Sequence, residues 1–221
     1  MAIHPKVRVF VRPYGSSVPL GFFAFGIGMF LYGALDIGWI KPSELHTVGL
    51  MHLTFVAPLE GLAAIVAFLA RDTVSGVALG LFTGSWLLGG FVELNGTPGQ
   101  LSTAQGCFLI AFTVAVLLVA SVSWLGQPMI AGIVTVAAAR GLASAVYELG
   151  GGKAWNHVAG WIALLIFCVA MYGGLAFLLE DAKGRAVLPI GRRGDSAEAI
   201  EGGMEDQLKG LADEPGVRKH L

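Results

Sequence analysis

Six long apolar runs, separated by short polar breaks, dominate the pattern of hydrophobic and polar positions along this 221-residue chain. Apolar positions are continuous within each run rather than alternating, which favours helices over the strands of a membrane barrel. A helix rises ~1.5 Å per residue and the hydrocarbon core is ~30 Å thick, so each run is long enough to cross a bilayer. The predicted spans are 19–40, 47–70, 74–94, 104–125, 129–149 and 155–179.

Pro58 interrupts the second run. Its ring nitrogen cannot donate to the carbonyl of Thr54, so a kink with locally exposed backbone acceptors is predicted. Two interpretations of this kink stay open. It either serves helix packing alone, or it lies beside a watery cavity, where irregular backbone at membrane depth is tolerated.

Composition agrees with a membrane protein, because 55% of the residues are hydrophobic and only 13% are charged. A soluble domain carries about twice that charge. We therefore expect an all-α membrane protein with an N-terminal segment (1–18), a six-helix membrane domain (19–179) and a tail (180–221). The tail is predicted to be largely disordered, with one short helix around residues 204–212.

A net charge of −1 argues against a nucleic-acid partner. The sequence shows no nucleophile–base pattern, metal-ligand spacing or cofactor motif, so no enzyme is expected.

Lysine and arginine near the ends of the runs predict the orientation. If the N-terminus is inside, eight of these residues lie on the inner side and two, Lys41 and Lys153, lie on the outer side. We therefore predict that both termini are cytoplasmic and that the protein spans the plasma (inner) membrane. The eight inner residues are Lys6, Arg8, Arg12, Arg71, Lys183, Arg185, Arg192 and Arg193.

Two charged residues lie inside apolar runs. Arg140 falls near the middle of 129–149, and Glu60 falls near the middle of 47–70. An arginine at the centre of a bilayer is costly, so Arg140 needs a partner, a cavity or water. The similar depths predict an ion pair between Arg140 and Glu60. This pair either fixes helix register, or Arg140 anchors a carboxylate while Glu60 acts as counter-charge or proton carrier.

Other titratable residues gather near the predicted outer ends of the helices. They are either separate solvated groups or the walls of one proton-accepting vestibule. A negative outer mouth would disfavour a bare anion unless protons accompany it. These residues are Asp36, His46, His52, Glu93, Glu148 and His157.

Small residues recur in the third run, where Gly76, Gly80 and Gly84 share one helix face. Such a seam predicts close helix packing, within or between protomers, and a glycine-lined pore is the alternative. Cys107 and Cys168 lie inside predicted helices and are expected to be buried apolar residues rather than metal ligands or a disulfide.

Three motifs carry a resemblance to a known family: Val18–Phe22 (VPLGF), His157–Ile162 (HVAGWI) and Gly184–Gly191 (GRAVLPIG). Together they resemble the acetate uptake transporter family, the succinate–acetate permeases, over roughly residues 16–191. The resemblance implies a six-helix protomer in a hexamer, each protomer having its own pathway for acetate and small carboxylates.

In that family, hydrophobic residues of the first, third and fifth helices narrow the pathway. Matched from the nearest motif, these positions fall on Phe25, Thr83 and Ala137. The family's Asn-Pro before the first motif is Ser16-Ser17 here. Two of the three constriction positions are small, which predicts a wider gate unless Arg140 fills it.

The predicted function is a transporter or channel for acetate and other small carboxylates, coupled to protons. Arg140 would hold the charge of the substrate, Thr83 and Ser85 would donate hydrogen bonds, and Phe25 would exclude hydrated ions. Two alternatives stay open. One is a channel for neutral solutes such as ammonia or urea, and the other is a membrane scaffold subunit that transports nothing.

Overall fold

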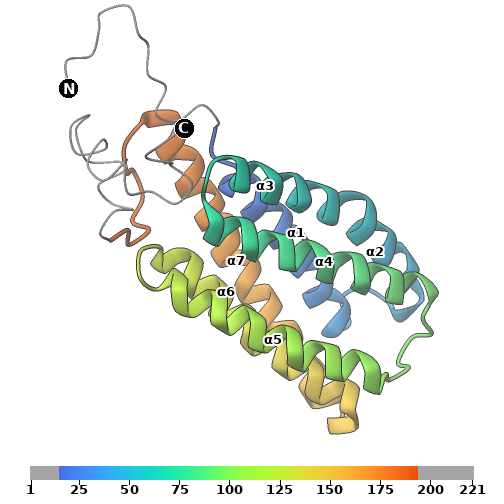
Figure 1. Cartoon of the computed structure of the whole chain (residues 1–221). Coiled ribbons are helices and arrows are strands. Elements are labelled where there is room, and N and C mark those ends of the chain that lie inside the picture. Colours follow the sequence, from blue (N-terminus) through green and yellow to red (C-terminus); the bar gives the residue numbers. More distant parts are fainter. Residues whose placement is uncertain (1–14, 194–221) are drawn as a thin grey trace, which may run out of the picture.

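The computed structural model describes residues 15–193, and every regular element in this range is helical. Six helices are long and apolar enough to cross a membrane, which confirms the predicted fold class. They form one bundle (Figure 1). The predicted tail helix at 204–212 and most of the N-terminal segment lie outside the described residues. The orientation of the bundle in the membrane stays a prediction.

Four spans are single helices: α1 (Val18–Asp36), α4 (Thr73–Asn95), α5 (Thr103–Ser123) and α7 (Lys153–Lys183). The second span combines a 3₁₀ turn (Pro42–Glu44), α2 (Leu45–Met51), a π turn (His52–Val56) and α3 (Ala57–Leu69). The fifth span is α6 (Pro128–Val146) followed by a second π turn (Tyr147–Gly151).

Two predicted ends differ from the structure. Helix α1 ends at Asp36 rather than at residue 40, because Gly38 takes a left-handed conformation (φ +84°) that the helix cannot continue through. Helix α7 continues past residue 179 to Lys183, where Gly184 (φ +62°) ends it. Charged residues near the last turn of α7 remain compatible with a helix, so hydropathy alone placed this end too early.

The π turn confirms that the second span is irregular at Pro58. The turn comes directly before Ala57 and Pro58, where the regular hydrogen-bond pattern is interrupted. Within the turn, His52 and Val56 are fully buried. The irregular segment therefore brings an imidazole into the interior of the bundle.

Helix α1 packs antiparallel against α7 and also contacts α2, α3 and α4. Close approaches at two glycines show the register: a Cβ on Gly26 would lie 3.0 Å from Ala170 Cβ, and one on Gly33 would lie 3.0 Å from Gly160 O. Helices α3 and α4 pack together, as do α5 and α6. Because the helices alternate in direction, α1 begins and α7 ends at the same end of the bundle, which we call the base (Figure 1).

The chain after α7 folds back across the base. Ile190 is buried, and the backbone N–H of Arg193 donates to Gly126 O at 3.2 Å. The guanidinium of Arg192 donates from Nε to Glu180 Oε2 at 3.1 Å and lies over the ring of Phe177. The segment that carries the LPIG motif is therefore fixed against α7 and the start of α6.

The outward surface is rich in large apolar side chains on α3, α4, α5 and α7, as expected where helices face lipid. Cys107 and Cys168 are both exposed on this surface, so the expectation of buried cysteines was wrong. Continuous apolar runs do not tell which helix face is turned toward lipid.

The predicted glycine seam makes only one close contact. Gly76 lies against the ring of Phe68, whereas added Cβ atoms on Gly80 and Gly84 would meet nothing within 4 Å. The tight crossing of α4 lies elsewhere: an added Cβ on Gly49 of α2 would lie 2.8 Å from Gly90 O. Glycine is therefore required at the α2–α4 crossing but not at Gly80.

Replacing Gly49 by alanine is expected to destabilise the fold by about 1–3 kcal/mol, because the new methyl group would press on backbone atoms that cannot move independently. The matched control is Gly132→Ala in α6, which fills open space and is expected to be neutral or slightly stabilising. Thermal unfolding in detergent, followed by tryptophan fluorescence, compares the two. A Gly49→Ala protein as stable as Gly132→Ala would contradict the described crossing.

Candidate functional site

A large cavity lies at the end of the bundle opposite the base, between α1, α4, α5, α6 and the start of α7. Its volume is about 810 Å³. We call it the vestibule. The charged and titratable residues of its wall include Asp36, Glu93, Arg140, Glu148, Lys153 and His157. Six polar residues were predicted to gather at this end, and four of them share this cavity: Asp36, Glu93, Glu148 and His157.

The other two predicted residues lie elsewhere. His46 is on the exposed surface, where its Nε2 lies 3.0 Å from Gly96 O. His52 is fully buried behind the vestibule wall.

Arg140 pairs with Asp36 and not with Glu60. Its Nη2 donates to Asp36 Oδ2 at 3.3 Å, and its guanidinium carbon lies 4.2 Å from the centre of the Tyr32 ring. The Nε of Arg140 is buried and makes no hydrogen bond within the described residues. The predicted Arg140–Glu60 pair was therefore wrong. The reason is depth: Asp36 in the last turn of α1 lines the same cavity as Arg140, whereas Glu60 lines a second, smaller cavity nearer the base.

His52 supports the vestibule wall from behind. Its Nδ1 lies 2.7 Å from Glu93 Oε2, and its Nε2 lies 3.3 Å from Gly28 O. The imidazole therefore lies between the side chain of Glu93 on α4 and the backbone of α1, and it fixes the position of Glu93 in the cavity wall.

A layer of aromatic rings closes the vestibule toward the base. The ring centres of Phe25 and Phe82 are 4.7 Å apart, and the edge of Trp86 packs against Phe25 at 6.0 Å. Phe112 completes the layer, 5.4 Å from Phe82. We call Phe25, Phe82, Trp86 and Phe112 the aromatic gate.

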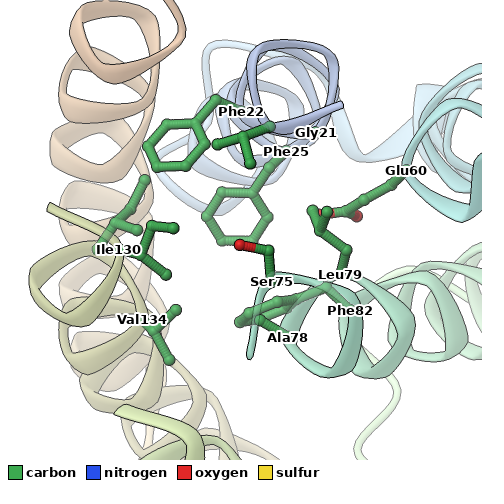
Figure 2. A pocket seen from close by; sticks show the side chains of 12 residues that line it. Gly21, Phe22, Phe25, Glu60, Ser75, Ala78, Leu79, Phe82, Ile130 and Val134 are labelled. Carbon is green, nitrogen blue, oxygen red and sulfur yellow. The ribbon is translucent and has the colours of Figure 1, made fainter. Parts of the chain in front are cut away.

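A second cavity, of about 40 Å³, lies on the base side of the gate. Figure 2 shows Phe25 inside this cavity, with Glu60 and Ser75 at its edge. The remaining wall comes from Val18, Gly21, Phe22, Ala78, Leu79, Phe82, Ile130, Ile133 and Val134. Phe82 lines both cavities, so the aromatic gate lies between them.

Glu60 is the one carboxylate among the residues that line the smaller cavity. It is fully buried, and neither carboxylate oxygen forms a hydrogen bond within the described part of the chain. The indole N–H of Trp86 lies near the Glu60 carboxyl group, but the two do not meet the geometric criteria of a hydrogen bond. Among the described residues, the wall of this cavity therefore holds a buried acid and no cation.

The predicted constriction residues have different positions in the structure. Phe25 belongs to the gate, Ala137 lines the vestibule, and Thr83 lines neither cavity. The Thr83 hydroxyl donates to Leu79 O at 2.8 Å, and its methyl group faces Gly61 of α3. The third helix instead contributes Phe82, one residue earlier. A phenylalanine of α4 thus lies between the two cavities, and the role of Thr83 in a wider constriction stays a prediction.

Ser85 lines the vestibule, as predicted for a residue that contacts substrate, but its hydroxyl donates to Phe82 O at 2.8 Å. Its role as a substrate donor stays a prediction.

Three residues of the vestibule wall, Tyr32, Phe82 and Trp86, were not among the predicted site residues. Helical spacing was the available signal: Phe25, Tyr32 and Asp36 are separated by seven and four residues, which places them on one face of α1.

Comparison with known proteins agrees with this architecture. No family model matches the chain, and no curated protein sequence matches it. Among solved structures, one described as the structure of the bacterial acetate channel SatP matches with a TM-score of 0.72. The match covers 80% of this chain and 99% of that chain, at 21% sequence identity. The chain therefore has a six-helix fold similar to that of the bacterial channel.

Proposed function

We propose that the protein is a membrane channel or transporter for acetate and other small carboxylates. The observation that carries this proposal is the position of Arg140, a guanidinium in the vestibule wall next to an aromatic gate between two cavities. The similarity in fold to a bacterial acetate channel supports the same function.

The cation and the rings have separate proposed tasks. Among the described residues, Arg140 donates one hydrogen bond, from Nη2 to Asp36, and a guanidinium can bind a carboxylate through two parallel hydrogen bonds. The ring pair of Phe25 and Phe82 excludes hydrated ions, as hydrophobic constrictions do in other channels. A small carboxylate would leave water at Arg140 and then pass the rings.

Glu60 is the proposed proton carrier. An ionised carboxylate without a partner is costly in an apolar cavity, so Glu60 would bind a proton whenever the cavity is dry. Hydration of the smaller cavity during transport would then permit release of the proton. This sequence of events would couple uptake of the carboxylate to a proton.

Assembly as a hexamer is part of the same proposal and follows from the family resemblance. The exposed Gly80 and Gly84 of α4 would permit close approach of a neighbouring protomer. The plasma (inner) membrane is the proposed location.

A channel for neutral solutes such as ammonia or urea is the second candidate. The pairing of Arg140 with Asp36 favours it, because an ion pair offers no net charge to attract an anion. If the protein conducts a neutral solute, exchanging the two charges between positions 36 and 140 would leave transport of that solute intact. If the protein transports carboxylates, the same exchange would abolish transport, because the guanidinium would no longer lie in α6.

Uptake of labelled acetate into proteoliposomes, with and without an inward proton gradient, tests the proposed function. We expect uptake above that of protein-free liposomes and a further increase with the gradient. Parallel measurements with urea and ammonia identify the neutral-solute alternative. If folded protein transports neither acetate nor a neutral solute, the scaffold hypothesis replaces both.

A further inference from the structure

The vestibule wall presents groups of both charges close together. Arg140 lies against Asp36 at 3.3 Å, and its guanidinium carbon lies 4.2 Å from the centre of the Tyr32 ring. The Tyr32 ring also packs against the ring of His52, with centres 4.4 Å apart, and His52 Nδ1 lies 2.7 Å from Glu93 Oε2. One cation and two carboxylates therefore surround a single phenol ring at the gate.

These groups have hydrogen-bonding capacity left for a ligand. Among the described residues, Arg140 uses only Nη2 for a hydrogen bond, so its other terminal nitrogen, Nη1, can donate to a ligand. Asp36 uses Oδ2 for Arg140, and Glu93 uses Oε2 for His52. Asn156 lies beside Asp36, where its Nδ2 donates to the backbone oxygen at 3.3 Å and the amide also interacts with the carboxyl group. Each carboxylate has a second oxygen, so the site can accept hydrogen bonds from a ligand and donate hydrogen bonds to it at adjacent positions.

Charge balance favours one class of ligand. The charged residues lining the vestibule include three carboxylates, Asp36, Glu93 and Glu148, and two cations, Arg140 and Lys153. A free anion would compete with Asp36 for Arg140 and would face Glu93 as well. A zwitterion brings an ammonium group of its own, so it can replace the Arg140–Asp36 contact with two new charge-assisted contacts.

We propose that the vestibule binds small zwitterions of the amino-acid class, with the ligand carboxylate on Arg140 and its ammonium group between Asp36 and Glu93. This inference rests on the proposed function, since it gives the same pathway a further substrate class. His52 acts as a positioning residue, because it holds Glu93 in the wall from behind.

Three solutes of similar size test the inference in wild-type proteoliposomes. Glycine carries both charges, acetate carries only the carboxylate, and glycinamide carries only the ammonium group. We expect saturable glycine uptake, inhibition of acetate uptake by glycine, and no uptake of glycinamide. This series does not require any variant to fold.

The variant Asp36→Asn tests the geometry. It removes the proposed ammonium partner and frees Arg140 for anions, so glycine uptake should fall and acetate uptake should rise. The ratio of glycine to acetate uptake should decrease at least about tenfold, the size expected for one charge-assisted hydrogen bond. The matched control is Glu44→Gln, which neutralises an exposed carboxylate at the same end of the bundle and outside the vestibule wall.

The outcomes separate this inference from the proposed function. Acetate uptake without glycine uptake or competition would overturn the zwitterion site and leave carboxylate transport in place. Glycine uptake without acetate uptake would overturn the proposed carboxylate function and support the site. An unchanged glycine-to-acetate ratio in Asp36→Asn would overturn the assignment of Asp36.

Discussion

Replacing Arg140 by alanine is expected to lower the initial rate of acetate uptake at least about 30-fold, the effect of removing one partner from a buried, hydrogen-bonded charge contact. Arg140 is the one guanidinium among the residues that line the vestibule, and it lies next to the aromatic gate. Its loss removes the proposed binding site for the carboxylate. Uptake of labelled acetate into proteoliposomes, at matched protein content, measures the effect.

Stability and transport must be separated in this experiment, because Arg140→Ala also leaves Asp36 without its ion-pair partner. The double variant Arg140→Ala/Asp36→Ala removes both charges, so it should regain thermal stability but not acetate uptake. The conservative variant Arg140→Lys should retain part of the uptake. The role of Arg140 as a carboxylate anchor would be contradicted if folded Arg140→Ala protein took up acetate at a rate within about twofold of wild type. Such a change is much smaller than that expected for a buried charge contact.

Shortening Phe82 is expected to open the pathway. The variant Phe82→Ala removes a ring that lies between the two cavities, so acetate uptake should increase several-fold and larger carboxylates such as succinate should begin to pass. The uptake rates of acetate and succinate measure this change. Truncating a buried phenylalanine costs about 3–5 kcal/mol of stability, so Phe82→Leu provides a milder second variant.

The neighbouring residue is the matched control for Phe82. Thr83→Ala should leave both uptake rates unchanged, because its side chain faces α3 and lines neither cavity. Altered selectivity in Thr83→Ala, together with normal selectivity in Phe82→Leu, would show that the family motif and not the structure locates the gate.

The hydrophobic pattern was sufficient to predict the six helices and their order. A stretch such as 104–125 has a single reading, because its length and continuous apolar character fit a membrane span and little else. The same continuity concealed which residues face inward. Position 83 is an example: adjacent residues on a helix point ~100° apart, so a match along the sequence cannot tell whether Thr83 or Phe82 faces the cavities, and the structure places Phe82 there.

The partner of Arg140 could not be predicted for a related reason. Counting residues from uncertain helix ends gave Glu60 and Arg140 similar depths, but the two lie on opposite sides of the aromatic gate. Asp36 was recognised only as a residue near a helix end. Its contact with Arg140 joins the last turn of α1 to α6, two helices far apart in the sequence, and the apolar runs give no information on such a contact.

The vestibule itself was one of two hypotheses for the polar helix ends, and the structure supports it for four of the six residues. His52 could not be placed because a π turn shifts the helical register around it. Regular spacing cannot describe a segment whose turns contain an extra residue.

The most direct test of the proposed pathway is the reactivity of a cysteine at position 137, whose alanine lines the vestibule three residues before Arg140. The variant Ala137→Cys would be made with Cys107 and Cys168 replaced by serine. We predict that a small charged thiol reagent blocks acetate uptake in this variant and that acetate slows the reaction. Modification that leaves uptake unchanged, or acetate that gives no protection, would contradict a carboxylate pathway through the vestibule.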